Sequence, residues 1–504
     1  MKKIINIIAI SVLTVLTACD LEKYPEDQYN EGNVTVDSKT ENQYSTRADM
    51  QGLRNSLYNN WMKDMQEKGI VDWLVYSECR ADNAYNGNPS TGEIVALEAN
   101  NQDAENKNVV RDWSWYLGQI SNANQIICNI DTIAVKDTSS LKMTETEHHQ
   151  WKAEAMCWRA FMLFRMVRLW GDVPVVTVIP PAITAENLEQ VYDAYFPSRT
   201  AATKVYDQII EDLEYASQYA PDVNPSNKML FSKAFADGML ARVYAEKDHQ
   251  DWTKVINYCK QVEGMGFTLE PKYGDLWGYD DTDAKRNSVE SICEITWSRT
   301  SGNWYWMMFH RNAYNPDDSF TWTKWITPSR SLIAAYDAEG DTQRKNASIA
   351  TDACSWSHYY PGAEYKFMHK VPTNASSWIM MRLGEIYLLH AEALAMTNQL
   401  SEAAAYVNKV RNRAGLKDLP SSASASQSAM LDAVLNERRL ELSFEGFRFF
   451  DLVRHDKAKE VHDAMYAQDS YWQQRTPLTD NTILMPVPQV DMDENPSLTQ
   501  NEGY

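Results

Sequence analysis

The chain is poor in basic residues and in the residues that dominate fibrous or unfolded proteins. Its 504 residues include 48 lysines and arginines against 69 aspartates and glutamates, which gives a net charge of -21. Such a surface repels phosphate, so we expect no nucleic-acid partner. Only 19 glycines and 18 prolines are present, and 44% of the residues are hydrophobic. These proportions exclude collagen-like and wholly disordered chains and favour a globular body.

The sequence signatures of the common enzyme classes are also absent. The chain contains no G-x-S-x-G, H-E-x-x-H, G-x-x-x-x-G-K-[ST] or G-x-G-x-x-G motif. We therefore predict a protein that is not an enzyme and that needs no cofactor. A glycosidase stays open as the least favoured alternative, because it requires only two suitably spaced carboxylates and the chain has 69 acidic residues.

Cysteine is scarce and shows no metal-binding pattern. Six cysteines follow Cys19, and no two of them stand in a C-x-x-C spacing, so we expect no metal site. Cys128, Cys157 and Cys259 fall on the apolar sides of predicted helices, where an unpaired cysteine packs as a small hydrophobic residue. Disulfide pairing among the six stays open, because an exported protein meets an oxidising environment. Whether calcium supports a loop also stays open.

The one clear apolar run lies at the N-terminus. Two lysines precede the uncharged run 4–16, and the sequence Leu-Thr-Ala-Cys then ends at Cys19. The run is shorter than the roughly 20 residues that a membrane-spanning helix needs, so it predicts a cleaved lipoprotein signal over residues 1–18. Cys19 would then be the lipidated N-terminus that anchors the mature chain in a membrane, and residues 19–46 would form a tether.

Helical periodicity dominates the chain after this tether. Apolar residues recur every three or four positions between Val205 and Ala220, which lines one face of a helix. The residues Ala234, Gly238, Ala241 and Ala245 form a stripe of small side chains that a neighbouring helix can approach closely. A small stripe facing large residues is typical of tetratricopeptide helix pairs, whose repeats have about 34 residues. Such pairs are predicted over 233–266, over 381–414, and earlier over 113–130 with 151–170.

The helical pattern weakens between residues 267 and 377. Loops dominate there, and a short β-like run covers residues 292–297. The predicted fold is therefore mostly α, a tetratricopeptide-like helical-repeat scaffold with a loop-rich, small-β insertion lobe. We expect an N-terminal helical region over 47–266, the insertion lobe over 267–377 and a C-terminal region over 378–504.

Aromatic residues gather in the insertion lobe without helical spacing. Nine occur within 29 residues, namely Trp297, Trp304, Tyr305, Trp306, Phe309, Tyr314, Phe320, Trp322 and Trp325. Most are expected to pack the lobe, but a few exposed rings would suit the C–H faces of pyranose sugars. In an extended chain Trp304 and Trp306 would share one face. A second loop, residues 80–86, offers polar groups for hydroxyls beside an aromatic ring.

The stretch from Leu431 to Gly446 combines an apolar face with several charges. We interpret Glu437, Arg438, Glu441 and Arg448 as an ion-pair network that fixes helix packing. Gly446 is predicted to supply the left-handed residue that ends the helix. A catalytic role for these acids is the weaker alternative, because no nucleophile or base is placed beside them.

Several ordered motifs carry a family pattern. The chain reads RLGEIYLLHAEA from Arg382, VNKVRNRAGL from Val407 and ERRLELSFEGFRFFDL from Glu437. It ends with NPSLTQNEGY, where Glu502 stands at a position that is usually proline, and WGDVP occurs earlier, from Trp170. Over its mature length the chain resembles the SusD/RagB family of outer-membrane nutrient-binding lipoproteins.

This resemblance implies a lipid-anchored protein of the outer membrane that faces the cell exterior. Similar proteins bind oligosaccharides or polysaccharides and deliver them to a TonB-dependent SusC-like transporter, with helical repeats as the rigid base and loops as the glycan site. Carried over to this chain, the resemblance implies these ligand-binding residues: Arg80, Asp82, Asn83, Tyr85, Trp304, Tyr305, Trp306 and Trp325.

Two alternatives use the same scaffold. The RagB branch implies peptides or another nutrient as the ligand, and a pure scaffold would cap the transporter without a ligand of its own. The tryptophan-rich loops favour a sugar.

Overall fold

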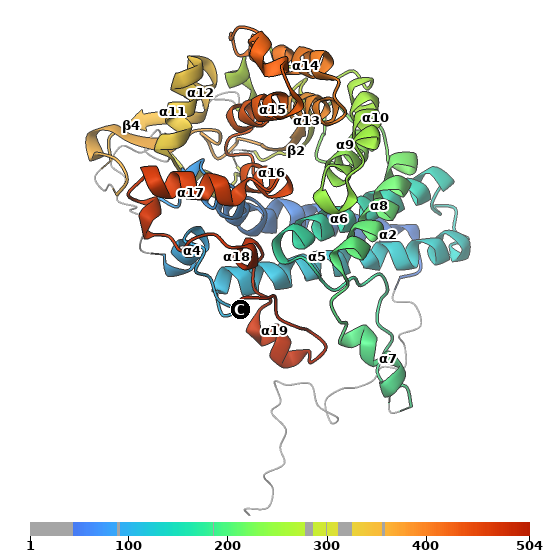
Figure 1. The fold of residues 1–504 in the computed structure, drawn as a ribbon. Coiled ribbons are helices and arrows are strands. Elements are labelled where there is room, and N and C mark those ends of the chain that lie inside the picture. The colour runs from blue at the N-terminus through green and yellow to red at the C-terminus, as the bar shows by residue number, and fades with distance from the viewer. Residues whose placement is uncertain are drawn as a thin grey trace, which may run out of the picture. The chain divides into compact units, whose positions relative to one another are not determined.

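Helices account for most of the folded chain, which Figure 1 draws as a ribbon. The structure is a computed structural model that describes residues 44–87, 91–184, 186–277, 286–298, 300–310, 325–354 and 358–504. The chain divides into two units, residues 1–45 and 46–504. The second unit contains all the helices and strands that the structure describes.

The helices of this unit differ widely in length. Those of its first half are α2 (Arg47–Asp64), α3 (Asp72–Leu74), α4 (Gly92–Glu98), α5 (Lys107–Lys136), α6 (Glu145–Trp170), α7 (Leu188–Tyr195), α8 (Ala202–Tyr219), α9 (Lys233–Tyr244) and α10 (Trp252–Glu263). Those of its second half are α11 (Arg330–Glu339), α12 (Thr342–Ser348), α13 (Leu383–Met396), α14 (Leu400–Arg413), α15 (Gln427–Glu441), α16 (Arg448–Arg454), α17 (Ala458–Gln468), α18 (Asp480–Ile483) and α19 (Gln489–Glu494).

Short turns of other helix types connect these elements. Two are π-helical, η1 (Met65–Val71) and η2 (Val75–Cys79), and the rest are 3-10 turns: η3 (Lys247–His249), η4 (Tyr273–Leu276), η5 (Tyr305–Met308), η7 (Gly362–Glu364), η8 (Ser421–Ser424) and η9 (Trp472–Gln474). Among the helices of the described ranges, none combines the length and the apolar character needed to cross a bilayer.

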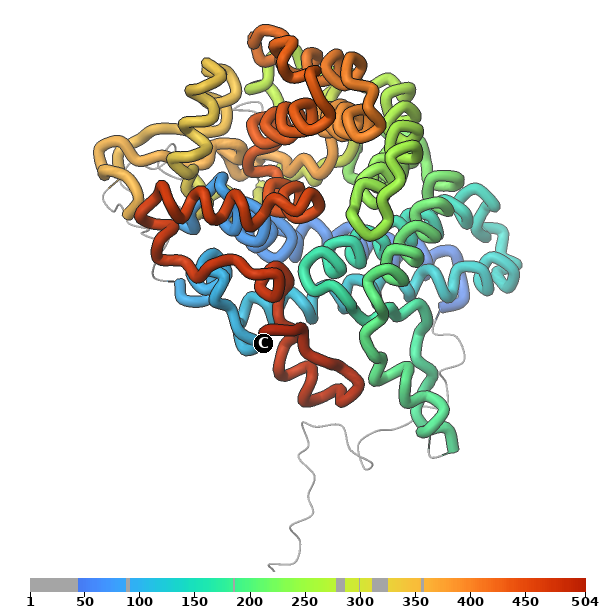
Figure 2. Tube along the Cα trace, viewed as in Figure 1, coloured from blue at the N-terminus to red at the C-terminus, as the bar shows by residue number. Residues whose placement is uncertain are grey.

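Neighbouring helices stack into a continuous array. α6 packs against α5 and α8, α9 packs against α8 and α10, and α13 packs against α10, α14 and α15. The tube in Figure 2 follows this path from the cyan helices to the orange ones. The helix pairs predicted over 233–266 and 381–414 are α9 with α10 and α13 with α14, so the helical-repeat scaffold is confirmed.

Local sequence signals determine where helices of this array begin. α6 starts after Thr144, whose hydroxyl accepts a hydrogen bond from the backbone N–H of Glu147 at 3.1 Å. The Glu147 carboxylate in turn accepts one from the backbone N–H of Thr144 at 3.0 Å. This reciprocal arrangement satisfies donors that the first turn of a helix leaves unpaired. Apolar periodicity then selects the buried face, as on α8, where Val205, Ile209 and Leu213 are buried.

The small-residue stripe of α9 allows a close approach at Gly238. A β-carbon at this position would lie 2.2 Å from the sulfur of Met381, well inside contact distance. Glycine therefore lets α9 touch the strand that leads into α13.

Three antiparallel two-stranded sheets join distant parts of the chain. β1 (Ala84–Tyr85) pairs with β3 (Thr327–Pro328), β2 (Ser291–Ile295) pairs with β6 (Trp378–Arg382), and β4 (Ile349–Asp352) pairs with β5 (Tyr365–Met368). The β-like run predicted over 292–297 corresponds to β2. The insertion lobe also contains α11 and α12. Apolar periodicity did not reveal α11 because only Leu332 and Tyr336 of its residues are buried.

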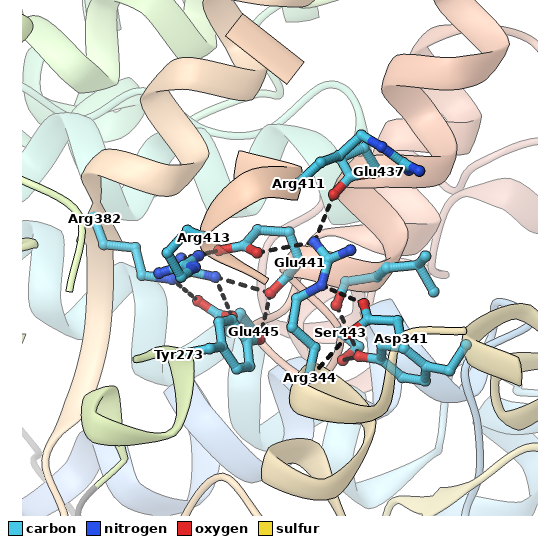
Figure 3. Close-up of polar contacts among 12 residues, drawn as sticks. Tyr273, Asp341, Arg344, Arg382, Arg411, Arg413, Glu437, Glu441, Ser443 and Glu445 are labelled. Atoms are coloured by element: carbon cyan, nitrogen blue, oxygen red, sulfur yellow. Dashed lines mark hydrogen bonds and ion pairs between the residues drawn. The ribbon is translucent and has the colours of Figure 1, made fainter. Parts of the chain in front are cut away.

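Buried ion pairs join this lobe to the C-terminal helices, as Figure 3 shows. We call them the arginine–glutamate network, formed by Glu290, Arg344, Arg382, Arg411, Arg413, Glu437, Glu441 and Glu445. Each of these side chains is at most 8% exposed. Their elements are far apart in sequence, so the network fixes how α12, β6, α14 and α15 meet.

Glu441 lies at the centre of the network. Its carboxylate is 2.6 Å from the guanidinium of Arg382 and 3.0 Å from that of Arg344, and it also pairs with Arg413. Burial opposes ionisation, but the three arginines outweigh it and hold the pKa of Glu441 far below its ordinary value. Its carboxylate is therefore charged inside the protein.

Gly384 lies against this charged centre. A β-carbon there would be 2.5 Å from Nη1 of Arg382 and 2.9 Å from carboxylate oxygens of both Glu290 and Glu441. Glycine at the start of α13 thus leaves room for the arginine to reach its acids.

The four charged residues predicted as one ion-pair network are all paired, but with different partners. Glu437 and Glu441 belong to the arginine–glutamate network. Arg438 instead pairs with Asp451 at 2.9 Å. Arg448 pairs with a residue far upstream, Asp82, at 2.8 Å.

The prediction that Gly446 ends the helix of 431–446 is wrong. α15 ends at Glu441, and its C-cap Leu442 has a negative φ of -105°. Gly446 lies beyond it with a φ of +89°, and a β-carbon there would be 2.4 Å from Nε1 of Trp73. The glycine serves a tight turn against the N-terminal helices.

Two of the three predicted core cysteines are confirmed. Cys157 and Cys259 are buried, whereas Cys128 is exposed because it lies beside the buried stripe of α5 and not within it. All six cysteines in the described ranges are free thiols. His390 is a buried histidine with a hydrogen-bonded partner, Glu263, 2.7 Å from its Nδ1.

Replacing Arg344 should test how much the network contributes to stability. Arg344→Ala leaves Asp341, Glu437 and Glu441 buried without this partner, so we expect the free energy of unfolding to fall by about 3–5 kcal/mol. Urea denaturation followed by circular dichroism measures the change.

The neighbouring residue provides the control. Lys345 pairs with Asp337 at 2.5 Å, but their side chains are 28% and 59% exposed. Lys345→Ala should therefore cost less than about 1 kcal/mol. Equal midpoints for the two variants would contradict a stabilising role of the buried pairs.

Candidate functional site

The predicted tryptophans lie on a short loop at the surface of the insertion lobe. We call residues 302–308 the tryptophan loop. Trp304 is 36% exposed, Trp306 is partly buried, and both belong to or adjoin the 3-10 turn η5. Because the chain turns here, the extended geometry that would place the two rings on one face does not occur.

Tyr305 points inward from the same loop. It is fully buried and contacts Trp297, Phe309 and Trp378, with ring centroids 5.4, 6.0 and 6.3 Å away. This ring packs the lobe and is closed to solvent, so the structure does not place it among ligand-accessible groups.

Asn303 anchors the tryptophan loop to the segment before β6. Its backbone N–H donates to the carbonyl of Asn374 at 2.7 Å, and its Nδ2 donates to the carbonyl of Ser376 at 2.9 Å. Its Oδ1 accepts the backbone N–H of Trp306 at 3.1 Å. Asn303 is 2% exposed, so these bonds form away from water.

Gln66 holds the loop from the opposite side. This residue belongs to the π-helical turn η1, and its Oε1 accepts the backbone N–H of Trp304 at 2.7 Å. Its Nε2 donates to the carbonyl of Met62 at 3.1 Å, which fixes the amide. A helical side chain thus positions the exposed ring, and π-turns are frequent at functional sites.

Trp325 connects the tryptophan loop to β1. Its backbone N–H donates to the carbonyl of Met308 at 2.7 Å, and the next residue, Ile326, donates to the carbonyl of Asn86 at 3.2 Å. Tyr85 then pairs with Thr327 in the β1–β3 sheet. Half-buried Trp325 therefore stands between the tryptophan loop and the loop that follows η2.

A group of tyrosines surrounds Tyr85. We call Tyr85, Tyr359, Tyr360 and Tyr471 the tyrosine cluster. Tyr85 is buried and stacks on Tyr359 with centroids 4.4 Å apart, whereas Tyr360 and Tyr471 are only partly buried. The ring of Tyr471 lies 5.0 Å from that of Tyr359. Burial and a hydrogen bond to Asp469 raise the pKa of Tyr85.

Exposed Arg330 lies across this cluster. Its guanidinium carbon is 4.8 Å from the ring centre of Tyr360 and 5.1 Å from that of Tyr471. Its Nη1 donates to the Tyr85 hydroxyl at 3.1 Å. Sequence reasoning missed Arg330, Tyr360 and Tyr471, and the adjacent pair Tyr359–Tyr360 was the only local signal.

Asp82 and Asn83 are buried among C-terminal side chains. Asp82 accepts hydrogen bonds from Arg448 at 2.8 and 3.1 Å and pairs with Arg439 at 3.1 Å. Burial alone would raise the pKa of Asp82, but the two arginines lower it to about 2. Asn83 donates to Glu78 at 2.7 Å and accepts from Arg439 at 2.9 Å.

Arg80 is also enclosed. It is 2% exposed, donates to the carbonyl of Ile483 at 3.2 Å, and lies 4.2 Å from the ring centre of Phe449. Burial lowers its pKa to about 10. Arg80, Asp82 and Asn83 thus hold the loop after η2 against the C-terminal region, and in this conformation a ligand does not reach them.

The predicted residues that remain accessible are tryptophans. Trp304 is exposed, and Trp306 and Trp325 are partly buried. Backbone hydrogen bonds join Trp325 to Met308 of the tryptophan loop and Ile326 to Asn86, the residue after Tyr85. Tyr314, Phe320, Trp322 and the lipidation candidate Cys19 lie outside the described residues.

Two acids near η1, Asp72 and Asp112, are buried and closed to solvent. Asp72 and Asp112 share Arg111, and both are at most 1% exposed. Burial raises the pKa of Asp72 to about 6 and that of Asp112 well above its usual range. These acids lack the solvent contact that hydrolysis needs. Where side chains are described, no three histidine, cysteine or acidic groups gather as metal ligands.

Comparison with known proteins gives two family matches. Residues 290–504 match the SusD family, and residues 35–245 match a family described as starch-binding and associating with the outer membrane. Together these ranges include most of the chain.

Individual relatives agree over nearly full lengths. SusD-like protein P2 of Formosa agariphila is 26% identical and is covered completely, as is this chain. Among solved structures, surface glycan-binding protein A from Bacteroides fluxus and a laminarin-binding SusD-like protein each have a TM-score of 0.71 at 22% identity. Each covers 92% of this chain and is itself covered completely, so the fold is shared. The chain belongs to the SusD/RagB family.

Proposed function

We propose that this protein binds oligosaccharides or polysaccharides on the outer membrane and delivers them to a SusC-like TonB-dependent transporter. The observation that carries the proposal is that Trp304 is exposed, with the partly exposed Trp306 beside it, on a loop anchored by Gln66 and Asn303, and that the partly exposed Trp325 is hydrogen-bonded to the same loop. Flat apolar rings suit the C–H faces of sugars, and fixed loops avoid the entropic cost of ordering the rings on binding.

The polar groups beside these rings complete a binding surface. Arg330 is exposed. The hydroxyls of half-buried Tyr360 and Tyr471 donate to the carbonyls of Pro328 and His358, and their oxygens can still accept hydrogen bonds from sugar hydroxyls. Because Arg80, Asp82 and Asn83 are enclosed, we assign them the role of holding the site and not of touching the ligand.

The comparisons support the same function. One matching family is described as starch-binding and as associating with the outer membrane, and two structural neighbours are named for binding glycans or laminarin. The proposed lipid on Cys19 would anchor the chain.

Peptide or another nutrient is the second candidate ligand for the same surface, and a scaffold without its own ligand is the third. The exposed Trp304 and its neighbouring tryptophans favour the sugar, because peptides are commonly held by main-chain hydrogen bonds at an exposed strand edge.

Replacing the exposed ring should remove sugar binding. We expect Trp304→Ala to weaken the affinity for the preferred glycan at least about tenfold, because a stacking surface is lost at the site. Isothermal titration against plant, fungal, bacterial and host glycans, with a peptide digest alongside, measures the affinity.

Tyr192→Ala provides the matched control, since Tyr192 is 40% exposed on α7, a helix that carries none of the proposed site residues. Its affinity should equal that of the parent. Binding of the digest alone would move the protein to the peptide alternative, and no binding by the folded parent would support the ligand-free scaffold.

Loosening the tryptophan loop should weaken binding without removing a ring. Asn303→Ala keeps the backbone bond to Asn374 but removes the side-chain bonds to Asn374, Ser376 and Trp306. Amide hydrogen exchange over residues 304–308 should therefore quicken, and glycan affinity should fall. The free energy of unfolding should drop by about 1–3 kcal/mol, the range for a lost buried polar partner.

Ser301→Ala alters the exposed neighbour, whose hydroxyl bonds to that of Ser298 at 2.7 Å. Exchange and affinity should stay unchanged in this variant. Unaltered exchange in Asn303→Ala would show that this anchor does not hold the rings.

A further inference from the structure

An apolar cleft lies between α5, α7 and α19, away from the tryptophan loop. Its volume is about 370 Å³. The cleft is lined from α5 by Trp113, Leu117 and Ile120. Other apolar lining residues are Val176, Phe196 and Leu498. Figure 1 shows α7 and α19 extending from the same side of the helical array. The proposed glycan function uses none of these residues.

Exposed apolar side chains surround this cleft. Of the thirteen large hydrophobic residues that are exposed in the described ranges, seven lie on the segment 178–195 or at Val490. Val178, Leu188 and Val490 are about half exposed, and Tyr192 and Tyr195 are each 40% exposed. Concentrated apolar surface of this kind marks interaction sites.

The segments that frame the cleft carry acids and no bases. Residues 173–198 contain Glu186, Glu189 and Asp193, and residues 476–504 contain several more acids, yet neither segment has a lysine, arginine or histidine. The part of α5 between Arg111 and Lys136 also lacks basic residues. Arg199, one residue beyond the first segment, donates to the carbonyls of Trp170, Asp172 and Thr499. The charged residues that line the cleft itself are the acids Asp491 and Glu494, which favours a positively charged occupant.

One acid reaches into the cleft wall. Asp491 lines the cleft with its Oδ2 buried, and the indole N–H of Trp113 faces its carboxylate and lowers its pKa. Burial and the neighbouring carboxylate of Glu494 outweigh this effect and raise the pKa of Asp491. The polar side chains of α5 that line the cleft are the uncharged Ser121, Asn124 and Gln125, and that of α7 is Tyr195. No lysine, arginine or histidine is therefore among the lining residues to pair with Asp491.

We propose that this cleft binds an extended segment of a partner protein, whose apolar side chains fill the cleft and whose lysine or arginine pairs with Asp491. A sugar fits poorly, because aliphatic walls would leave its hydroxyl groups without partners. Anionic lipid headgroups would meet repulsion from the acids that line the cleft. A basic, apolar peptide satisfies both features at once.

Small probes separate the charge requirement from the apolar one. 4-Phenylbutylammonium, 4-phenylbutyrate and 4-phenylbutanol share one apolar body, so isothermal titration of the purified chain with each isolates the head group. We expect the ammonium to bind about tenfold more tightly than the carboxylate, with the alcohol between them. Its affinity should rise with pH as Asp491 loses its proton, because the cation pairs only with the ionised acid.

Two matched variants locate the interaction. Asp491→Asn should abolish the preference for the ammonium and its pH dependence while leaving the affinity for the alcohol unchanged. Asp493→Asn, two residues along α19, removes an exposed acid that does not line the cleft and should behave as the parent.

A peptide pair tests the class of occupant. Acetyl-LFKLFK-amide should bind the purified chain and compete with 4-phenylbutylammonium, whereas the same peptide with glutamate for lysine should not bind. Equal binding of amine and acid, no saturable binding of the probes, or unaltered preference in Asp491→Asn would each overturn the proposal. None of these outcomes depends on glycan affinity, so the two proposals fail separately.

Discussion

The buried charge of Glu441 is the constraint on which the arrangement of the lobe depends. A carboxylate removed from water is stable only if its cationic partners are all in place, and here they come from α12, β6 and α14. These elements must therefore dock together or not at all. β6 ends at Arg382 inside the network. The segment just before β6 accepts hydrogen bonds from Asn303, which anchors the tryptophan loop. The buried charges thus fix the position of β6, and the segment before β6 in turn fixes the loop that carries the exposed aromatic ring.

The helical array separates two surfaces of different chemistry. Trp304 on the tryptophan loop and the cation Arg330 beside the tyrosine cluster are exposed, whereas the cleft between α5 and α19 is lined by apolar residues and the acids Asp491 and Glu494. The first surface suits a polyhydroxylated ligand and the second suits a basic protein segment. Under the proposed function, ligand binding and partner binding would use separate surfaces.

Sequence patterns predicted the features that depend on local spacing. Helix pairs follow from apolar periodicity, and α9 with α10 and α13 with α14 lie where expected. Whether a residue next to a buried helix face is itself buried is harder to predict, which is why Cys128 was wrongly predicted to be packed. The site depends on long-range pairing: Tyr85 meets Tyr359 and Tyr471, and Asp82 meets Arg448, across hundreds of residues. A loop rich in polar residues reads like a ligand site in sequence, and only the fold shows that its polar groups are already occupied.

Gly384 has a consequence for how sequences of this kind can diverge. No side chain fits there while Arg382, Glu290 and Glu441 hold their positions, so glycine is required as long as these three charged residues are present. In a relative that lacks one of these acids, the space beside it would be free, and a larger residue could replace the glycine. The string RLGE would then indicate an intact charged interior and not a ligand preference.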